Sequence, residues 1–328
     1  MTEHLPWHRD QWRSVAARLV RDTLPHALLL AGPAGVGKRD FAQRLAQAAL
    51  CEQRDAQGEA CGGCRACRLF AVHNHPDLRV VAPSEPGKAI GVDQVREAVA
   101  FLAQTAQYGG YKLLIIDPTD AMNVNAANAL LKTLEEPSAH SLLLLVSAHR
   151  GRLPATIVSR CQRLSFTTPA PALAREWLAQ RCGAEEDLEL LLALAEGAPL
   201  RAVALREGET LKARGAVLQG LRAVACGEEI CSVADRLSKH GVQLVLYWMY
   251  LGIADMIRLH AAADAAALIN RDSASQLAEL ARRIATPPLH RFLNELRRGL
   301  SLAERPLNPL LLLEDILLSW QALFCSSR

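Results

Sequence analysis

Four cysteines that could bind a metal lie close together in the first quarter of the chain: Cys51, Cys61, Cys64 and Cys67. The spacing C-x9-C-x2-C-x2-C lets neighbouring thiolates converge on one ion, and two glycines permit the tight turn among them. Four thiolates form a complete tetrahedral ligand set for Zn²⁺ and leave no position for a reactive water. The spacing therefore predicts one structural Zn²⁺ per chain, with four reduced thiols as the alternative. A redox role is a weaker interpretation, because it would rest on a single C-x-x-C pair.

A glycine-rich segment, GPAGVGKR at residues 32–39, follows the pattern of a phosphate-binding loop up to its last position. It lies between a short apolar run and a helical pattern, and the amino terminus of such a helix adds positive potential. Glycines let backbone amides turn toward phosphates, and the lysine reaches the outer phosphates. A glycine-rich turn without function is the alternative. The candidate nucleotide-binding residues are Gly32, Gly35, Gly37 and Lys38, with Asp117 from a second motif.

Two positions that ATP hydrolysis requires are altered in this sequence. Arg39 stands where a serine or threonine hydroxyl normally binds Mg²⁺, and a guanidinium would repel the ion. Asp117 is placed to hold Mg²⁺ through water, but Pro118 follows it in place of the glutamate that orients the attacking water. Nothing suggests that Asp120 substitutes for that glutamate. The sequence therefore predicts no hydrolysis by the chain itself, and it leaves ATP binding open.

Strand and helix patterns alternate in the first half of the chain. Short apolar runs predict strands at 27–31, 78–81, 111–117, 141–147 and 162–166. Amphipathic patterns predict helices at 10–22, 38–50, 92–106 and 123–136. This alternation implies an α/β domain with a mostly parallel sheet covered by helices on both faces.

The pattern changes after Phe166. Residues 167–171 (TTPAP) form a linker with a helix cap, and everything from Ala172 onward is predicted to be helical. Short helices are expected at 185–196 and 200–207, and Gly208 marks a second boundary. Roughly five helices should follow, the last one opening at Asn308-Pro309. The expected domains are residues 1–167 with the cysteine insertion 51–67, residues 168–207, and residues 208–328.

Composition excludes some functions. A net charge of +3 and an aromatic content of 5% argue against a stand-alone protein that binds nucleic acid through bulk charge or stacking. Residues 1–13 contain no apolar signal core, and acidic residues at 314 and 315 break the apolar stretch 310–318, so no membrane span is expected. Nine cysteines fit a reducing compartment, and a cytoplasmic location is expected.

Four segments together carry a family resemblance: GPAGVGK at 32–38, the cysteine insertion, NALLKTLEEP at 128–137 and LPATIVSRC at 153–161. With them the chain resembles the clamp-loader branch of the AAA+ ATPases, which comprises the bacterial gamma and delta-prime subunits. The resemblance is firm over residues 7–166, and the helical remainder fits by pattern. It implies a RecA-like AAA+ domain, a small helical lid and an all-α collar. Degenerate ATP motifs are characteristic of the delta-prime type, so Arg39 and Pro118 favour that type.

The resemblance also implies partners and further site residues. The partners would be gamma/tau and delta clamp-loader subunits, the sliding clamp and, through the complex, primer–template DNA. Such a hetero-oligomer belongs to the DNA polymerase III holoenzyme, at a cytoplasmic, nucleoid-associated replisome, and needs no membrane. Arg160 of the SRC triplet would act as an arginine finger on a neighbour's ATP. Ser147 and Arg201 match the positions of nucleotide sensors, and both are expected to be structural here.

Three functions are therefore compared. The leading one is a stator that lacks its own ATPase activity, contributes Arg160 in trans and holds a ring through its collar. The second is an active ATPase subunit of the gamma type, which Arg39 and Pro118 disfavour. The third is a separate zinc-bearing nucleic-acid binder, which the low charge disfavours.

Overall fold

The computed structural model describes residues 4–85, 87–108, 110–183, 187–261, 268–303 and 307–325 of the 328-residue chain. The chain folds into two compact units, Met1–Leu173 and Ala174–Arg328. Every strand among the described residues belongs to the first unit, and the second is built from helices. The expected change from an α/β pattern to a helical pattern is confirmed.

The first unit contains a sheet of five strands: β1 (Ala27–Ala31), β2 (Leu78–Val81), β3 (Lys112–Ile116), β4 (Ser141–Ser147) and β5 (Gln162–Ser165). They lie in the order β2-β3-β4-β1-β5, and all neighbouring pairs are parallel. The predicted parallel sheet is confirmed, and β1, β2 and β4 have the predicted bounds. Strands β1, β3 and β4 are buried along their whole length. Such apolar runs suit parallel strands covered on both faces.

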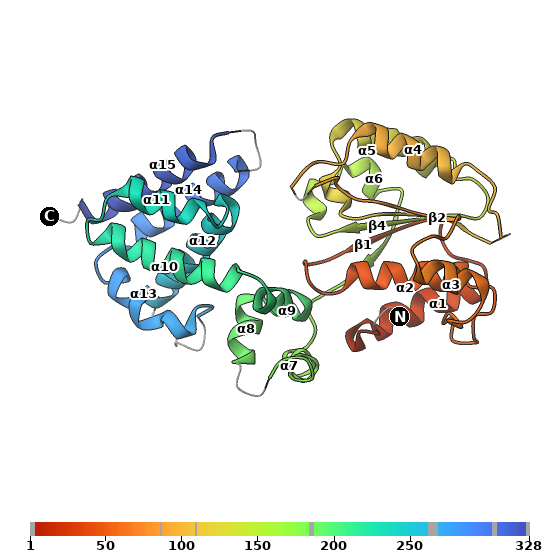
Figure 1. The fold of residues 1–328 in the computed structure, drawn as a ribbon, viewed down its shortest axis with the longest axis horizontal. Coiled ribbons are helices and arrows are strands. Elements are labelled where there is room, and N and C mark those ends of the chain that lie inside the picture. The colour runs from red at the N-terminus through yellow and green to blue at the C-terminus, as the bar shows by residue number, and fades with distance from the viewer. Residues whose placement is uncertain are drawn as a thin grey trace. The chain divides into compact units, whose positions relative to one another are not determined.

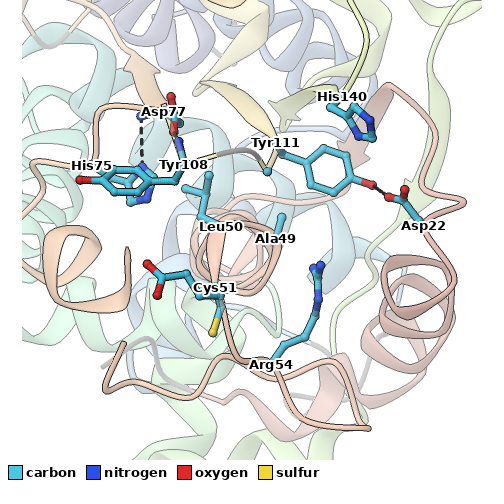
Figure 2. Close-up of a pocket in the computed structure, with 12 residues that line it drawn as sticks. Asp22, Ala49, Leu50, Cys51, Arg54, His75, Asp77, Tyr108, Tyr111 and His140 are labelled. Carbon is cyan, nitrogen blue, oxygen red and sulfur yellow. Dashed lines mark hydrogen bonds between the residues drawn. The ribbon is translucent and has the colours of Figure 1, made fainter. Parts of the chain in front are cut away.

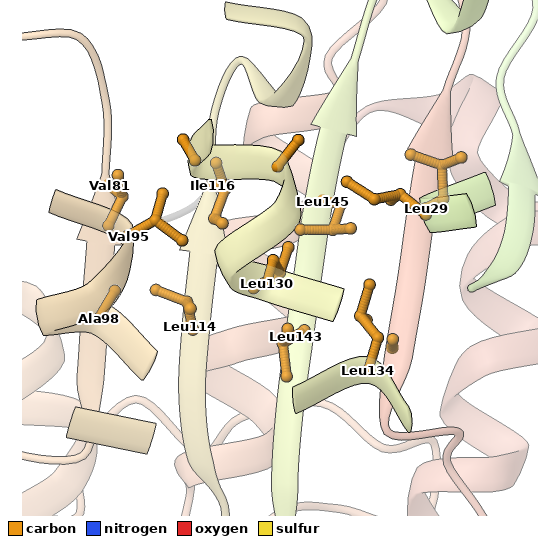
Figure 3. Packing of buried hydrophobic residues seen from close by; sticks show 14 of the residues in the cluster. Leu29, Val81, Val95, Ala98, Leu114, Ile116, Leu130, Leu134, Leu143 and Leu145 are labelled. Atoms are coloured by element: carbon orange, nitrogen blue, oxygen red, sulfur yellow. The ribbon is translucent and has the colours of Figure 1, made fainter. Parts of the chain in front are cut away.

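Helices cover both faces of the sheet (Figure 1). One face carries α1 (Arg9–Val20), α2 (Lys38–Leu50) and α3 (Arg65–Ala71), and the other carries α4 (Val92–Leu102), α5 (Val124–Glu135) and α6 (Ala155–Val158). Figure 3 shows the second face, where Leu114 and Leu143 of the sheet meet Val95 of α4 and Leu130 of α5. These packed layers fix the ends of the strands, where the candidate site residues lie.

Helix α4 is shorter than the sequence predicts and ends at Leu102 rather than 106. Beyond it, the backbone N–H groups of Gln107 and Tyr108 donate to the buried carboxylate of Asp77, at 2.8 and 3.1 Å. Lys112 Nζ donates to the same carboxylate at 3.0 Å. A buried carboxylate needs such donors, and this requirement bends the chain away from the helix. The short helices α3 and α6 were not predicted from the sequence.

Helix α7 (Pro171–Ala179) begins at the end of the first unit and continues into the second. The other α-helices of the second unit are α8 (Leu188–Leu194), α9 (Pro199–Glu207), α10 (Thr210–Ala225), α11 (Ile230–Ser238), α12 (Val242–His260), α13 (Ala274–Ala281), α14 (Thr286–Leu302) and α15 (Pro309–Cys325). The last helix opens where the sequence predicts, because Asn308 Oδ1 accepts from the Leu310 N–H at 3.0 Å. Six α-helices follow Gly208 in the described part of the chain, close to the expected number.

Helix α12 is long and apolar enough, by length and composition, to cross a membrane, which the sequence analysis did not foresee. It packs against α10, α13 and α14. Its Asp255 is fully buried and accepts backbone hydrogen bonds from Ile269 at 3.0 Å and Asn270 at 2.7 Å. These contacts are those of a core helix of the second unit.

Candidate functional site

The phosphate-loop residues lie together at the carboxyl end of β1. A Cβ atom on Gly32 would stand 2.1 Å from the carbonyl oxygen of Phe166, so only glycine fits there. Gly37 has a φ of 90° in the left-handed region and directly precedes α2. The loop therefore has the strand–loop–helix context that the sequence predicts, and the four predicted loop residues Gly32, Gly35, Gly37 and Lys38 belong to one turn of chain.

Lys38 turns back onto its own loop. Its Nζ donates to the carbonyl oxygens of Gly32 at 2.7 Å and Pro33 at 2.6 Å, and the residue is buried. Burial lowers the pKa of the Lys38 amine, and the negative charges of Asp117 and Asp120 oppose that shift. The amine that would reach a phosphate thus satisfies two carbonyl groups of the loop.

Arg39 forms an ion pair with Asp117, through Nε and Oδ2. The Asp117 carboxylate is buried at the end of β3, whereas most of the Arg39 side chain is exposed. The residue that replaces the Mg²⁺ ligand therefore also takes the aspartate that would help to hold Mg²⁺. A bound divalent cation would have to displace this guanidinium.

Two residues near the amino terminus hold the loop at the Val36 carbonyl group, and neither was predicted from the sequence as part of the site. Trp7 Nε1 donates to the Val36 carbonyl oxygen at 2.9 Å, and His8 Nε2 lies 2.8 Å from the same oxygen. Edge-to-face contacts hold the His8 ring against Phe41 and Phe166. Burial lowers the pKa of His8 to about 4, so the neutral ring donates from Nε2 at neutral pH.

The two expected sensor residues differ in their surroundings. Ser147, at the end of β4, is fully buried, and its Oγ has no hydrogen-bond partner among the described residues. Arg201 belongs to the second unit, where it pairs with Glu196 at 3.2 Å and donates to Tyr247 Oη. Tyr247 Oη in turn donates to Glu196 at 2.7 Å. Arg201 therefore ties α9 to α12, whereas the Ser147 hydroxyl is enclosed in the first unit.

Arg160 follows α6 and is partly exposed. Its Nη2 lies 2.6 Å from Glu135 Oε1 at the end of α5. Its Nη1 donates to the Thr156 carbonyl oxygen at 3.0 Å and to Ser159 Oγ at 3.3 Å. The guanidinium is thus held by three acceptors that come from two elements.

The four predicted cysteine ligands converge on one point, with all Sγ atoms within 4.8 Å of one another. The Sγ atoms of Cys51 and Cys64 are 3.9 Å apart, close to the ~3.8 Å between two sulfurs that each bind one Zn²⁺ at ~2.3 Å in a tetrahedron. Cys64 also caps α3 by accepting the Cys67 N–H at 3.4 Å. The cluster could hold a metal such as zinc.

Backbone amides further favour thiolates in this cluster. The Cys61 N–H donates to Cys51 Sγ, and the Cys64 N–H donates to Cys61 Sγ, both at 3.3 Å. Such donors lower the pKa of Cys61 to about 7. Burial has the opposite effect and raises the pKa of Cys51 and Cys67. A cation at the centre would offset the cost of ionising these buried thiols.

A cavity of about 390 Å³ lies beside the cysteine cluster, at the amino-terminal edge of the sheet (Figure 2). Tyr111 Oη donates to Asp22 Oδ1 on its wall at 2.7 Å. His75 Nδ1 accepts the Asp77 N–H at 3.1 Å, so Nε2 carries the ring hydrogen, and that buried group has no partner among the described residues. The phosphate loop follows β1 at the opposite edge, so this cavity is separate from the candidate nucleotide site.

Comparison with known proteins gives consistent matches. A family model described as DNA polymerase III, delta subunit, matches residues 7–170, and one described as DNA polymerase III, delta subunit, C terminal, matches residues 208–322. The DNA polymerase III subunit delta' of Pseudomonas aeruginosa is 46% identical over 224 residues, which cover 68% of this chain and 67% of the relative. The subunit delta' of Escherichia coli K12 is 32% identical over 317 residues, which cover 95% of this chain and 94% of the relative.

Among solved structures, a DNA polymerase III gamma subunit-related protein from Thermotoga maritima matches with a TM-score of 0.48 and 17% identity. The match covers 96% of this chain and 100% of that one.

Proposed function

The chain belongs to the DNA polymerase III delta-prime family, and from that premise we propose that it is a clamp-loader subunit that does not hydrolyse ATP. It acts as a stator: it supplies Arg160 in trans to the ATP site of a neighbouring subunit and helps to load the sliding clamp on primed DNA. Its place of action is the cytoplasmic replisome.

The observation that carries this proposal is the ion pair between Arg39 and Asp117. An internal cation stands where a hydrolytic site needs Mg²⁺, and Pro118 offers no base to activate water. Both features count against the alternative of an active gamma-type ATPase. Weak nucleotide binding without Mg²⁺ through the loop remains compatible with the proposal.

Arg160 supports the trans role through its chemistry. A guanidinium can stabilise the negative charge that develops on the γ-phosphate during hydrolysis. Arg160 is partly exposed and bonds to Glu135, Thr156 and Ser159 rather than to the phosphate loop of its own chain. Because the ATP site of this chain lacks groups needed for hydrolysis, Arg160 could assist hydrolysis only at the site of another subunit.

The helical second unit supports assembly with other subunits. We propose that residues 168–207 are the lid and residues 208–328 the collar of the complex. On α15, Leu311 and Leu318 are 60% and 55% exposed and lie seven residues apart, on one side of the helix. Exposed leucines at this spacing suit helix packing against another collar. The proposed partners are the gamma/tau and delta subunits, and the clamp and primer–template DNA are reached through the complex.

We further propose that the cysteine cluster holds one structural Zn²⁺. The ligand set Cys51, Cys61, Cys64 and Cys67 fills all four tetrahedral positions and leaves no open site for catalysis. The metal would fold the 51–67 insertion, which has few apolar residues of its own.

The test of the proposed function is Arg160→Ala in a clamp loader reconstituted with gamma-type and delta subunits. Loss of the finger should lower clamp- and DNA-stimulated ATPase activity and clamp loading, because one neighbouring site loses its charge stabilisation. Trans-acting fingers are worth ~10³–10⁵ in rate at a single site, but the total should fall less because other sites keep their own fingers. Arg160→Lys should restore little, since an ammonium lacks the planar fork.

Arg163→Ala, at an exposed arginine three residues further on in β5, is the matched control and should leave both rates unchanged. Equal ATPase activity and equal loading with wild-type and Arg160→Ala subunits would refute the trans role.

A further inference from the structure

Two adjacent glutamates stand at the carboxyl end of α5, and among the described residues only Glu135 has an ionic partner. Glu135 is the last residue of the helix, and Glu136 is its cap. The negative end of the helix dipole disfavours carboxylates at this place. Arg160 Nη2 lies 2.6 Å from Glu135 Oε1 and offsets the negative charge of that carboxylate. Glu136 forms no ion pair with the residues that the structure describes. Of the two glutamates, Glu135 is therefore the one that contacts Arg160.

The contacts of Arg160 fix the direction of its side chain. Glu135 holds Nη2, while the Thr156 carbonyl oxygen and Ser159 Oγ hold Nη1. A long arginine side chain loses conformational freedom when it is held in one direction, and a group already held so does not lose it again during the reaction. The end of α5, together with α6 and the residue that follows it, thus holds the guanidinium in the chain by itself.

Donors remain for a phosphate. A guanidinium has five N–H groups, and the three contacts of Arg160 involve Nη1 and Nη2 only. Nε–H and the second hydrogen on Nη2 are not needed for these contacts. A phosphate oxygen can therefore be bound while Glu135 keeps its place.

We infer that Glu135 is a positioning residue for the arginine finger: its carboxylate orients the Arg160 guanidinium for a neighbouring subunit's ATP. This inference rests on the proposed trans function of Arg160. Glu135 touches neither nucleotide nor the reacting atoms, and it acts only through Arg160. Half-exposed ion pairs add little to the stability of a fold, so the value of this pair lies in orientation.

The experiment places Glu135→Ala and Glu135→Gln subunits in the reconstituted clamp loader and measures kcat and KM for ATP with clamp and primed DNA present. In that complex the other ATPase subunits carry inactivated phosphate loops, so that only the site facing this chain hydrolyses ATP. Glu135→Ala should lower kcat about two- to fivefold, the range expected for one partly exposed ion pair, with KM unchanged. Glu135→Gln keeps an acceptor oxygen and should lie between Glu135→Ala and wild type.

Two controls isolate the effect. Glu136→Gln removes the same charge one residue further on and should leave kcat unchanged. Glu135→Ala should have no further effect when Arg160→Ala is already present, because a positioning residue has nothing left to position. A merely structural role would lower activity in that background too.

The outcomes separate the two proposals. A fall with Arg160→Ala but none with Glu135→Ala would overturn the positioning role and leave the proposed function intact. A rise in kcat with Glu135→Ala would show that Glu135 restrains the finger, and it would also overturn the inference. No change with Arg160→Ala would refute the proposed function itself.

Discussion

Lys38 and Arg39 are adjacent in the phosphate loop, and both side chains are bonded to other groups of the same chain. In an active loop the lysine binds the outer phosphates, and the next residue binds Mg²⁺. Here Lys38 satisfies the Gly32 and Pro33 carbonyl groups, and Arg39 neutralises Asp117. Trp7 and His8 also hold the loop at the Val36 carbonyl group. We therefore expect this loop to serve the fold of the first unit rather than catalysis.

Lys38→Ala tests that expectation. The substitution would leave two loop carbonyl groups without their donor, so it should lower the free energy of unfolding by about 1–3 kcal/mol. Hydrolysis of ATP by the isolated chain should be negligible both before and after the change. Chemical denaturation and a steady-state ATPase assay on monodisperse protein measure the two effects.

Lys38→Met keeps the volume of the side chain and removes the same donor, so it should lower the free energy of unfolding by a similar amount. Wild-type turnover near that of ordinary phosphate-loop ATPases, abolished by Lys38→Ala, would contradict this account of the site.

At the scale of elements, the cysteine insertion is attached to α1 and α2 by contacts that do not involve the cysteine cluster. Arg44 of α2 forms an ion pair with Glu59 of the insertion, and its guanidinium lies 3.8 Å from the centre of the Trp12 ring. Gly58 packs so closely on Ala16 of α1 that an added Cβ atom would stand 2.9 Å from that methyl group. These contacts anchor one side of the insertion without metal, whereas the proposed Zn²⁺ would hold the loop that carries the cysteines.

Elemental analysis should find about one Zn²⁺ per chain, and its removal should act locally. Chelation should expose four titratable thiols and lower the unfolding temperature of the first unit, while helical signal from the second unit persists. Binding should weaken as pH falls, because protons compete for the thiolates. Thiol titration, circular dichroism and calorimetry measure these changes.

Cys61→Ser should reduce the zinc content sharply, and Cys226→Ser, at an exposed cysteine outside the cluster, should leave it unchanged. Metal-free protein that is fully folded, with all four thiols freely reactive, would refute a structural zinc site.

At the scale of the whole molecule, the proposed function requires assembly with other subunits. The proposed finger Arg160 and the exposed leucines of α15 would both act on other subunits rather than within a single chain. Leu311 and Leu318 contribute little to the core of their own unit, because both are more than half exposed. A charge placed there should disturb contacts with other subunits without unfolding the unit that carries it.

The double substitution Leu311→Glu/Leu318→Glu should weaken assembly with gamma-type and delta subunits at least tenfold, since burial of two charges in an apolar contact is unfavourable. Light scattering of the mixed subunits measures assembly, and thermal unfolding of the isolated chain should change little. Val124→Glu, at an exposed valine of the first unit, is the control. Assembly as tight as that of wild type would remove α15 from the interface.

The sequence by itself determined the parts that depend on local pattern. The strands β1, β2 and β4, the start of α2 and the opening of α15 follow from apolar runs, glycines and caps that act within a few residues. The phosphate loop and the cysteine cluster were predictable for the same reason, since their chemistry requires fixed residue types at fixed spacing. The family resemblance likewise follows from short motifs.

Only the tertiary structure decided which distant groups meet. Arg39 and Asp117 are 78 positions apart, and nothing in either motif says that the arginine takes the aspartate. The same holds for three other contacts. Glu135 pairs with Arg160, Trp7 and His8 bind the Val36 carbonyl group, and the Asp77 carboxylate binds the chain just after α4. Each is a hydrogen bond or ion pair between side chain and partner far apart in the chain. Their formation requires the packed sheet and helices to bring the groups within about 3 Å, a condition that local pattern cannot express.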